Sequence, residues 1–254
     1  MERTGRVQSI DRAVQILNCF TEQRPELKLT EIAEELGLNK STAHGLINTL
    51  KYHGLIEQDE ESQKYRLGLY LLQLAERAAG SIDVIGIARP HLVEICNKVD
   101  ETIHIANLDG LEIVYIDKFE STHSMRIYTT RGSRNPAYCT GVGKAMLAFQ
   151  DIDFLNKEIP IQMKKLTPNT LEYKGDLMKE LEQIRKDGYA LDREENVEGL
   201  FCVAVPIFDR LGQVHYGLSV SGPTVRMTGE KVQQTIRLLK EAGAEISQRL
   251  GYRG

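Results

Sequence analysis

Residues 29–68, LTEIAEELGLNKSTAHGLINTLKYHGLIEQDEESQKYRLG, hold the pattern that decides the fold of the first part of this chain. Apolar residues at helical spacing predict a short helix over 30–36 and a second one over 40–53. Two extended pieces around a polar turn then predict a hairpin over 55–68. With an earlier helix over 9–22, this order predicts a winged helix-turn-helix.

The ends of these helices carry residues that start and stop helices. Ser9, Thr30 and Asn39 stand where a side chain can cap the first amides of each helix. Gly37 and Gly54 follow the second and third helices and predict their ends. In the first helix, an apolar stripe from Ile10 through Ala13, Val14 and Leu17 to Phe20 is expected to face the core.

The outward side chains of the third helix are candidates for contacts with DNA, since this helix enters the major groove in the motif. None of them is acidic, whereas the helix before it carries three glutamates, and this segregation of charge suits a surface that faces phosphates. The candidates are Lys40, Ser41, Thr42, His44, Asn48 and Lys51, joined from the hairpin by Lys64, Tyr65 and Arg66. Arg3 and Arg6 could form a minor-groove arm. The alternative is a small packing module that binds no DNA.

The composition of the 254 residues suits two modest domains. The net charge of −4 argues against a generally basic protein but leaves room for a local DNA-binding face. No apolar run approaches the length of about 18 residues that spans a bilayer, so no membrane is expected. The start lacks an apolar signal core, so a cytoplasmic protein with reduced thiols is expected. The four cysteines form no C-x-x-C pair, and no cofactor or metal is expected.

The segment after the hairpin predicts a subunit contact. Residues 67–79, LGLYLLQLAERAA, are apolar on nearly every side of a helix, and such a helix must be buried all round. In a small domain the expected cover is another subunit. The pattern continues helical over 83–99, where Pro90 is allowed only as a kink or a break.

The remaining sequence predicts an α+β domain, in which strands are flanked by helices. Hairpin turns are expected at Asp109–Gly110 and around Gly212. The predicted strands are 102–108, 111–119, 124–130, 200–209 and 213–222. The predicted helices are 141–149, 175–188 and 229–250.

Several runs together resemble the IclR family of bacterial transcriptional regulators over nearly the whole chain. They are SIDRAVQILNCF at 9–20, LTEIAEELGLNKSTAHGLINTL at 29–50, KYRLG at 64–68, TGVGKAMLA at 140–148, GYALDREENVEGLFCVAVPIFD at 188–209 and SVSGP at 219–223. The resemblance implies a winged helix-turn-helix over 1–67, a linker helix over 68–82 and a GAF-like effector-binding domain over 83–254. It also implies homodimers, often paired into homotetramers.

Carried over by position, the resemblance also implies an effector pocket. Its members would be Gly141, Val142, Asp192, Leu200, Cys202, Ser219 and Ser221. Asn135 belongs to the same wall, where relatives often have an apolar residue, and this departure leaves the identity of the effector open. Gly45 stands where the family often has arginine, so the operator sequence cannot be transferred.

The residues themselves allow more than one use of this region. Ser219 and Ser221 are two apart on a predicted strand, so both hydroxyls point to one face, either a pocket or solvent. The amides at Gly141 start a helix and could hold an anion, although the spacing fits neither a Walker loop nor a dinucleotide fingerprint. Asp192 could accept a hydrogen bond from an effector hydroxyl or cap the next turn.

Together these patterns predict a repressor whose affinity for double-stranded operator DNA is tuned by a small organic or hydroxylated acid. An activator with an aromatic effector is the alternative. An enzyme is disfavoured, because a Cys202 nucleophile needs a nearby base and nothing in the sequence brings His104 or His215 to it. A metal site of histidines and Asp192 lacks ligand spacing. Turnover of the ligand would separate an enzyme from a regulator.

Overall fold

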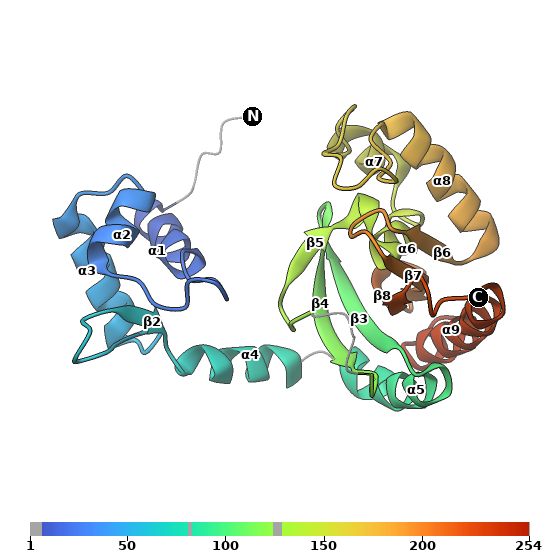
Figure 1. Ribbon diagram of the computed structural model, residues 1–254, viewed down its shortest axis with the longest axis horizontal. Coiled ribbons are helices and arrows are strands. Elements are labelled where there is room, and N and C mark those ends of the chain that lie inside the picture. Colours follow the sequence, from blue (N-terminus) through green and yellow to red (C-terminus); the bar gives the residue numbers. More distant parts are fainter. Residues whose placement is uncertain (1–6, 81–82, 124–128, 254) are drawn as a thin grey trace. The chain divides into compact units, whose positions relative to one another are not determined.

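The computed structural model describes residues 7–80, 83–123 and 129–253, which form two compact units that divide between residues 80 and 83 (Figure 1). Arg3, Arg6 and most of the strand predicted over 124–130 therefore lie outside the described residues. Among the described helices, none is long and apolar enough to cross a membrane.

The first unit is the predicted helix-turn-helix with its hairpin. Its elements are α1 (Gln8–Asn18), α2 (Leu29–Glu35), α3 (Lys40–Tyr52), β1 (Ile56–Gln58), β2 (Tyr65–Leu67) and α4 (Tyr70–Gly80). β1 and β2 pair antiparallel. The core between them is built from buried apolar side chains of each element before α4, among them Ile16, Ile32, Ile47 and Ile56. A small shared core of this kind is what holds three short helices and a hairpin together.

The predicted helix ends are confirmed at the turn between α2 and α3. The predicted caps Ser9 and Thr30 are wrong. The Asn39 side chain accepts a hydrogen bond from the Thr42 amide at 2.8 Å, and Gly37 takes the left-handed conformation at φ 60° that ends α2. Ser9 and Thr30 lie inside their helices, which begin one residue earlier. The start of α2 is held instead by Glu31, whose carboxylate accepts the Lys28 amide at 2.7 Å.

Among the described residues of the first unit, apolar side chains of α1 and of the α4 segment are not covered by the rest of that unit. In α1, Ile10 and Val14 are exposed, so the predicted inward stripe is wrong at these two positions. The helix also ends at Asn18, before Phe20. In and before α4, Leu69 is 67% exposed and Leu72 is 64% exposed. Leu69 and Leu72 are three residues apart in the sequence, and several exposed large apolar side chains on one segment favour a contact surface.

The second unit is built around a six-stranded antiparallel sheet of order β5-β4-β3-β8-β7-β6. The strands are β3 (Thr102–Asp109), β4 (Glu112–Phe119), β5 (Arg134–Pro136), β6 (Ala190–Arg193), β7 (Leu200–Phe208) and β8 (Val214–Pro223). The short strands β5 and β6 were not predicted. Thr129 and Thr130 belong to no strand.

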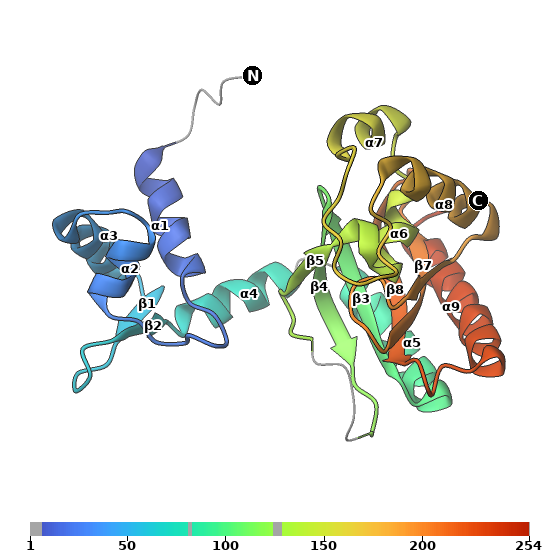
Figure 2. The ribbon, with the colours of Figure 1, turned by 45° about the horizontal axis from the view of Figure 1, so that its top comes forward.

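Helices cover both faces of this sheet (Figure 2). One core packs α5 (Asp83–Val99) and α9 (Gly229–Arg249) against the sheet. The other packs α6 (Gly141–Leu147), α7 (Ile152–Glu158) and α8 (Lys174–Asp187) on the opposite face. α7 was missed in the sequence, and α5 runs through Pro90 without a break. The central strands β7 and β8 are mostly buried on both faces, which explains the continuous apolar run of β7.

Candidate functional site

The predicted contacts of α3 form one polar exposed face. Lys40, Ser41, His44, Asn48 and Lys51 are exposed, and only Thr42 is half-buried. The Asn48 amide lies 3.3 Å from His44 Nδ1, one helical turn earlier. These side chains supply donors and acceptors of the kinds that meet base edges and phosphates in a major groove.

The hairpin contributes less to this face than the sequence predicts. Lys64 is half-buried, and Arg66 is exposed but forms an ion pair with Glu57 at 3.2 Å. Tyr65 is only 5% exposed and packs in the core, while its backbone pairs with Leu27. The Tyr65 ring is therefore a structural residue here, because alternation along a strand turns it inward while its neighbours face out.

All eight predicted effector residues line one cavity of about 200 Å³ in the second unit. They come from distant parts of the chain: β5, the start of α6, β6, β7 and β8. The cavity is also lined by His104, Tyr115, Thr129, Thr140, Asn196 and Val197, which were not among the predicted pocket residues. No lysine or arginine is among the described residues that line it.

Strand register explains why the predicted residues meet. Ser219 on β8 lies opposite His104 on β3, and Ser221 lies opposite Cys202 on β7. Cys202 in turn lies opposite Asp192 on β6. Residues directly opposite in antiparallel strands point to the same face, so Ser219 and Ser221 both face the cavity. The interpretation of these serines as solvent-facing is wrong, since both are buried.

Asp192 holds a turn, as one of its two predicted uses requires, and it also lines the cavity, where contact with an effector stays a prediction. Its Oδ1 accepts the Glu195 amide at 2.8 Å, and its side chain is almost wholly buried. The pKa of Asp192 is raised from 3.8 to about 7, mainly by burial, and the Glu195 carboxylate also contributes to the rise. The group can therefore both donate and accept hydrogen bonds near neutral pH.

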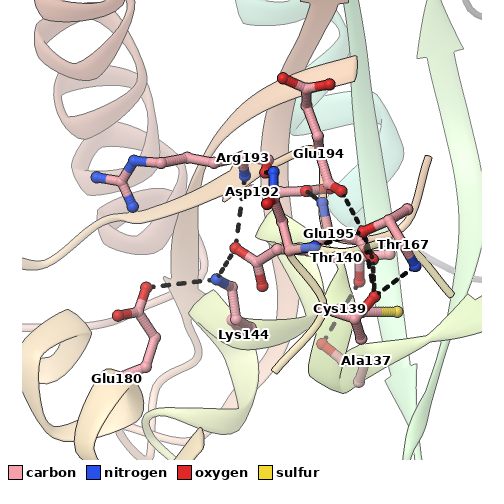
Figure 3. A network of polar contacts seen from close by, with 12 residues as sticks. Ala137, Cys139, Thr140, Lys144, Thr167, Glu180, Asp192, Arg193, Glu194 and Glu195 are labelled. Carbon is pink, nitrogen blue, oxygen red and sulfur yellow. Dashed lines mark hydrogen bonds and ion pairs between the residues drawn. The ribbon is translucent and has the colours of Figure 1, made fainter. Parts of the chain in front are cut away.

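A buried ion pair fixes the loop behind Asp192 (Figure 3). Lys144 in α6 is fully buried, and its ammonium lies 2.6 Å from Glu195 and 3.3 Å from Glu180. The Thr170 hydroxyl donates to the Glu195 carbonyl at 2.6 Å. This network holds the segment that brings Asn196 and Val197 to the cavity.

The glycines at the start of α6 serve close packing. A Cβ on Gly143 would lie 2.4 Å from the Ala137 Cα, so only glycine fits there. A Cβ on Gly141 would lie 3.3 Å from the Cys202 Cβ. α6 has only seven residues, so it gives the anion interpretation little support, because the dipole of a helix grows with its length.

Cys202 and His104 line the same cavity, but among the described residues the hydrogen bond of His104 goes to Thr129 and not to the thiol. Burial raises the pKa of the Cys202 thiol well above its usual value, which opposes formation of a thiolate. His215 is exposed and does not line the cavity. Within the described part of the chain, no group of three or more histidine, cysteine or acidic residues is placed to hold a metal.

Comparison with known families matches both units. The family description "Bacterial transcriptional regulator IclR C-terminal" matches residues 76–248. The description "IclR helix-turn-helix domain" matches residues 9–60. Together these matches cover the helix-turn-helix, the sheet and every residue of the cavity.

Similar proteins extend over the same length. The HTH-type transcriptional regulator XynR of Escherichia coli is 40% identical over 97% of this chain and 98% of its own. The regulator KdgR of the same organism is 38% identical over 97% and 94%. The crystal structure of an IclR transcriptional regulator from Alicyclobacillus acidocaldarius has a TM-score of 0.85 at 30% identity, covering 97% of this chain and 100% of that one.

Proposed function

We infer the function from one premise: this chain belongs to the IclR family of bacterial transcriptional regulators. It is a DNA-binding regulator and not an enzyme, and its C-terminal domain is of the type that binds effectors. We propose that it acts as a repressor, that α3 reads the operator, and that a small hydroxylated acid in the cavity changes its affinity for DNA. In this proposal the protein acts on the bacterial chromosome and is therefore cytoplasmic.

The chemistry of the side chains that line the cavity is the observation that supports the proposed effector. Serine, threonine and asparagine side chains and Asp192 offer many hydrogen-bonding groups in a small volume. Such a set suits hydroxyl groups on the ligand. Because the described lining has no cationic side chain, neutral donors must hold any carboxylate, and a phosphorylated or multiply charged ligand is disfavoured.

The proposed assembly is a homodimer, and pairs of dimers give a tetramer. The exposed apolar residues of α1 and α4 support the dimer, because single chains rarely leave such a set in water. In this proposal residues 1–67 bind DNA, 68–82 form the linker helix and 83–254 bind the effector. Two linked copies read two half-sites of the operator.

An aromatic effector is a second candidate, which one observation favours. A recess of about 470 Å³ shares Asn135 and Asn196 with the cavity. Its other walls include the apolar side chains Leu111, Ile159 and Met163. A ligand with a ring could place the ring there and its polar group in the cavity.

The test uses two variants, one in α3 and one in the cavity, and measures operator binding and effector binding for each. The operator is first selected from a random duplex library with the full chain, and hydroxylated and aromatic acids are then screened by thermal shift. Asn48→Ala should weaken binding to the selected operator by about 1–3 kcal/mol, with little change on random DNA or in effector affinity.

Ser221→Ala serves as the reciprocal variant. It should weaken effector binding by about 10- to 150-fold and leave effector-free operator binding unchanged. If the selected acid bound Ser221→Ala as tightly as the unaltered protein, the cavity would not be the effector site. If Asn48→Ala lost affinity equally on random DNA, α3 would position the protein without reading sequence.

A further inference from the structure

His104 is a buried polar side chain on the wall of the cavity with an unused nitrogen. It lies on β3, is 1% exposed, and its ring packs against Tyr115 at 4.9 Å between ring centres. The Nε2 atom lies 2.8 Å from the Thr129 hydroxyl. The Nδ1 atom has no hydrogen-bond partner among the described residues. Buried polar atoms are nearly always paired, so an unpaired one beside a cavity indicates a ligand contact.

The imidazole of His104 is neutral. The pKa of His104 is lowered from 6.5 to about 3, first by burial and second by the nearby Lys118 ammonium. Glu120 acts in the opposite direction but does not outweigh them. A neutral imidazole carries one proton, so one ring nitrogen donates a hydrogen bond and the other accepts one.

The surroundings decide which nitrogen carries the proton. The Lys118 ammonium donates a hydrogen bond to the backbone oxygen of Thr129, the residue that faces Nε2. Lys118 also pairs with Glu120 at 2.6 Å, but Lys118 has the larger effect on His104. The net positive field at that end of the ring favours a lone pair on Nε2, which accepts a hydrogen bond from the Thr129 hydroxyl. The proton of the imidazole then resides on Nδ1.

We propose that His104 binds the effector through its Nδ1–H, as the donor to a carboxylate oxygen, and that Thr129 fixes this tautomer. The proposal rests on the proposed function, because it takes the cavity as the effector site. It also orients the ligand. His104 lies opposite Ser219, whereas Asp192 lies on β6, three strands away from β3. The carboxylate therefore lies at the His104 end and the hydroxyls of the ligand lie toward Asp192, where charge repulsion is smallest.

The first test needs no ligand. The full chain is labelled with ¹⁵N-histidine, and long-range ¹H–¹⁵N correlations assign the tautomer of each ring, with His104→Gln identifying the His104 signals. The expected result is a neutral ring protonated at Nδ1 between pH 6 and 8. A ring protonated at Nε2, or one that becomes charged in this range, would overturn the proposal.

The second test uses matched ligands: glycolate with ethylene glycol, glycerate with glycerol, and gluconate with glucitol. Each polyol replaces the carboxylate of its acid by a hydroxymethyl group. At least one acid should shift the His104 Nδ1–H signal and bind about tenfold or more tightly than its polyol. If no acid moved the signal, or if acid and polyol bound equally, the proposal would fail.

Variants of His104 separate the two nitrogens. His104→Asn keeps an amide near the position of Nδ1, His104→Gln keeps one near Nε2, and His104→Phe keeps only the ring against Tyr115. Affinity for the acid should fall about 10- to 150-fold in the Phe and Gln variants and be largely kept in the Asn variant. Equal affinity in all three would overturn the proposal. Thermal unfolding checks their folding. Operator binding without ligand is measured separately, so failure to bind DNA would count against the proposed function alone.

Discussion

Lys144 illustrates how one residue acquires its importance only in the folded chain. In the sequence it is a polar position within a predicted helix, yet in the structure it is fully buried beside Glu195 and Glu180. Removal of one partner of a buried ion pair leaves the other charge without compensation. Breaking this pair should therefore destabilise the fold more than breaking an exposed ion pair with the same distance between its charged atoms.

Lys144→Met should lower the free energy of unfolding of the C-terminal unit by about 3–5 kcal/mol, measured by denaturant titration at pH 7. Adding Glu195→Gln should recover part of the loss, because the stranded carboxylate is then removed. Lys186→Met is the matched control, since its pair with Glu182 is exposed and screened by solvent, so its loss should change stability little. Equal stability of Lys144→Met and Lys186→Met would contradict this account.

Asp192 gives the stability of the protein a dependence on pH. Its pKa rises from 3.8 to about 7 in the folded state, so folding takes up a proton between these values. The contribution of Asp192 to stability is therefore favourable at low pH and is lost as pH rises toward 7. Asp192→Asn keeps an acceptor for the Glu195 amide but does not titrate.

The measurement compares the free energy of unfolding of the two proteins between pH 5 and 8. The unaltered protein should lose stability relative to Asp192→Asn as pH rises through about 7. His104, whose pKa is lowered from 6.5 to about 3, acts in the opposite sense and costs stability as pH falls below 6.5. His104 is present in both proteins, so its effect cancels in the difference. Parallel pH profiles would show that Asp192 does not titrate in this range.

Among the elements, α4 is notable because its apolar side chains are exposed in the single chain. Its described side chains are largely exposed, although Leu72 and Leu74 are apolar. Leu72→Glu should therefore convert dimers to monomers at micromolar concentration and weaken operator binding, because two half-sites need two linked copies. Sedimentation velocity measures the first effect and DNA titration the second.

Gln73→Glu is the matched control for α4, because it introduces the same charge at a neighbouring exposed position that is already polar. It should leave assembly nearly unchanged. If the unaltered protein sedimented as a monomer at micromolar concentration, the proposed contact through α4 would be wrong.

The molecule as a whole divides into two units with separate cores. Residues 83–254 contain both cores of the second unit and the whole cavity. This segment should therefore fold alone and unfold cooperatively on heating. It should also bind the selected acid with the same affinity as the full chain does in the absence of DNA. A molten segment without cooperative unfolding would contradict the division.

Coupling between the two units should be reciprocal. If the acid lowers operator affinity by a given factor, saturating operator must lower the affinity for the acid by the same factor. Two titrations of the full chain, each with and without the other ligand, measure both factors. A factor of one in both titrations would mean that the effector site and the DNA site are not coupled.

Local sequence patterns were sufficient to predict those features whose interactions join residues close together in the chain. Asn39, Gly37 and the hairpin obey rules of capping, left-handed turns and alternation, which act between neighbours in the chain. The same rules failed where competing partners were available, as at Thr30, which Glu31 replaces as the residue that holds the start of α2. Short strands such as β5 carry too few residues to show a period, so they could not be recognised.

The cavity required both kinds of information. Its predicted members came from resemblance to a family and from the two-residue spacing of Ser219 and Ser221, which a strand places on one face. Only the tertiary structure shows that His104 lies opposite Ser219 on the paired strand and that Lys144 of α6 lies beside Glu195. These partners are separated by many residues, and no local rule of sequence links them. Their burial, the neutral state of His104 and the raised pKa of Asp192 arise from that packing, because desolvation depends on which groups the fold brings together.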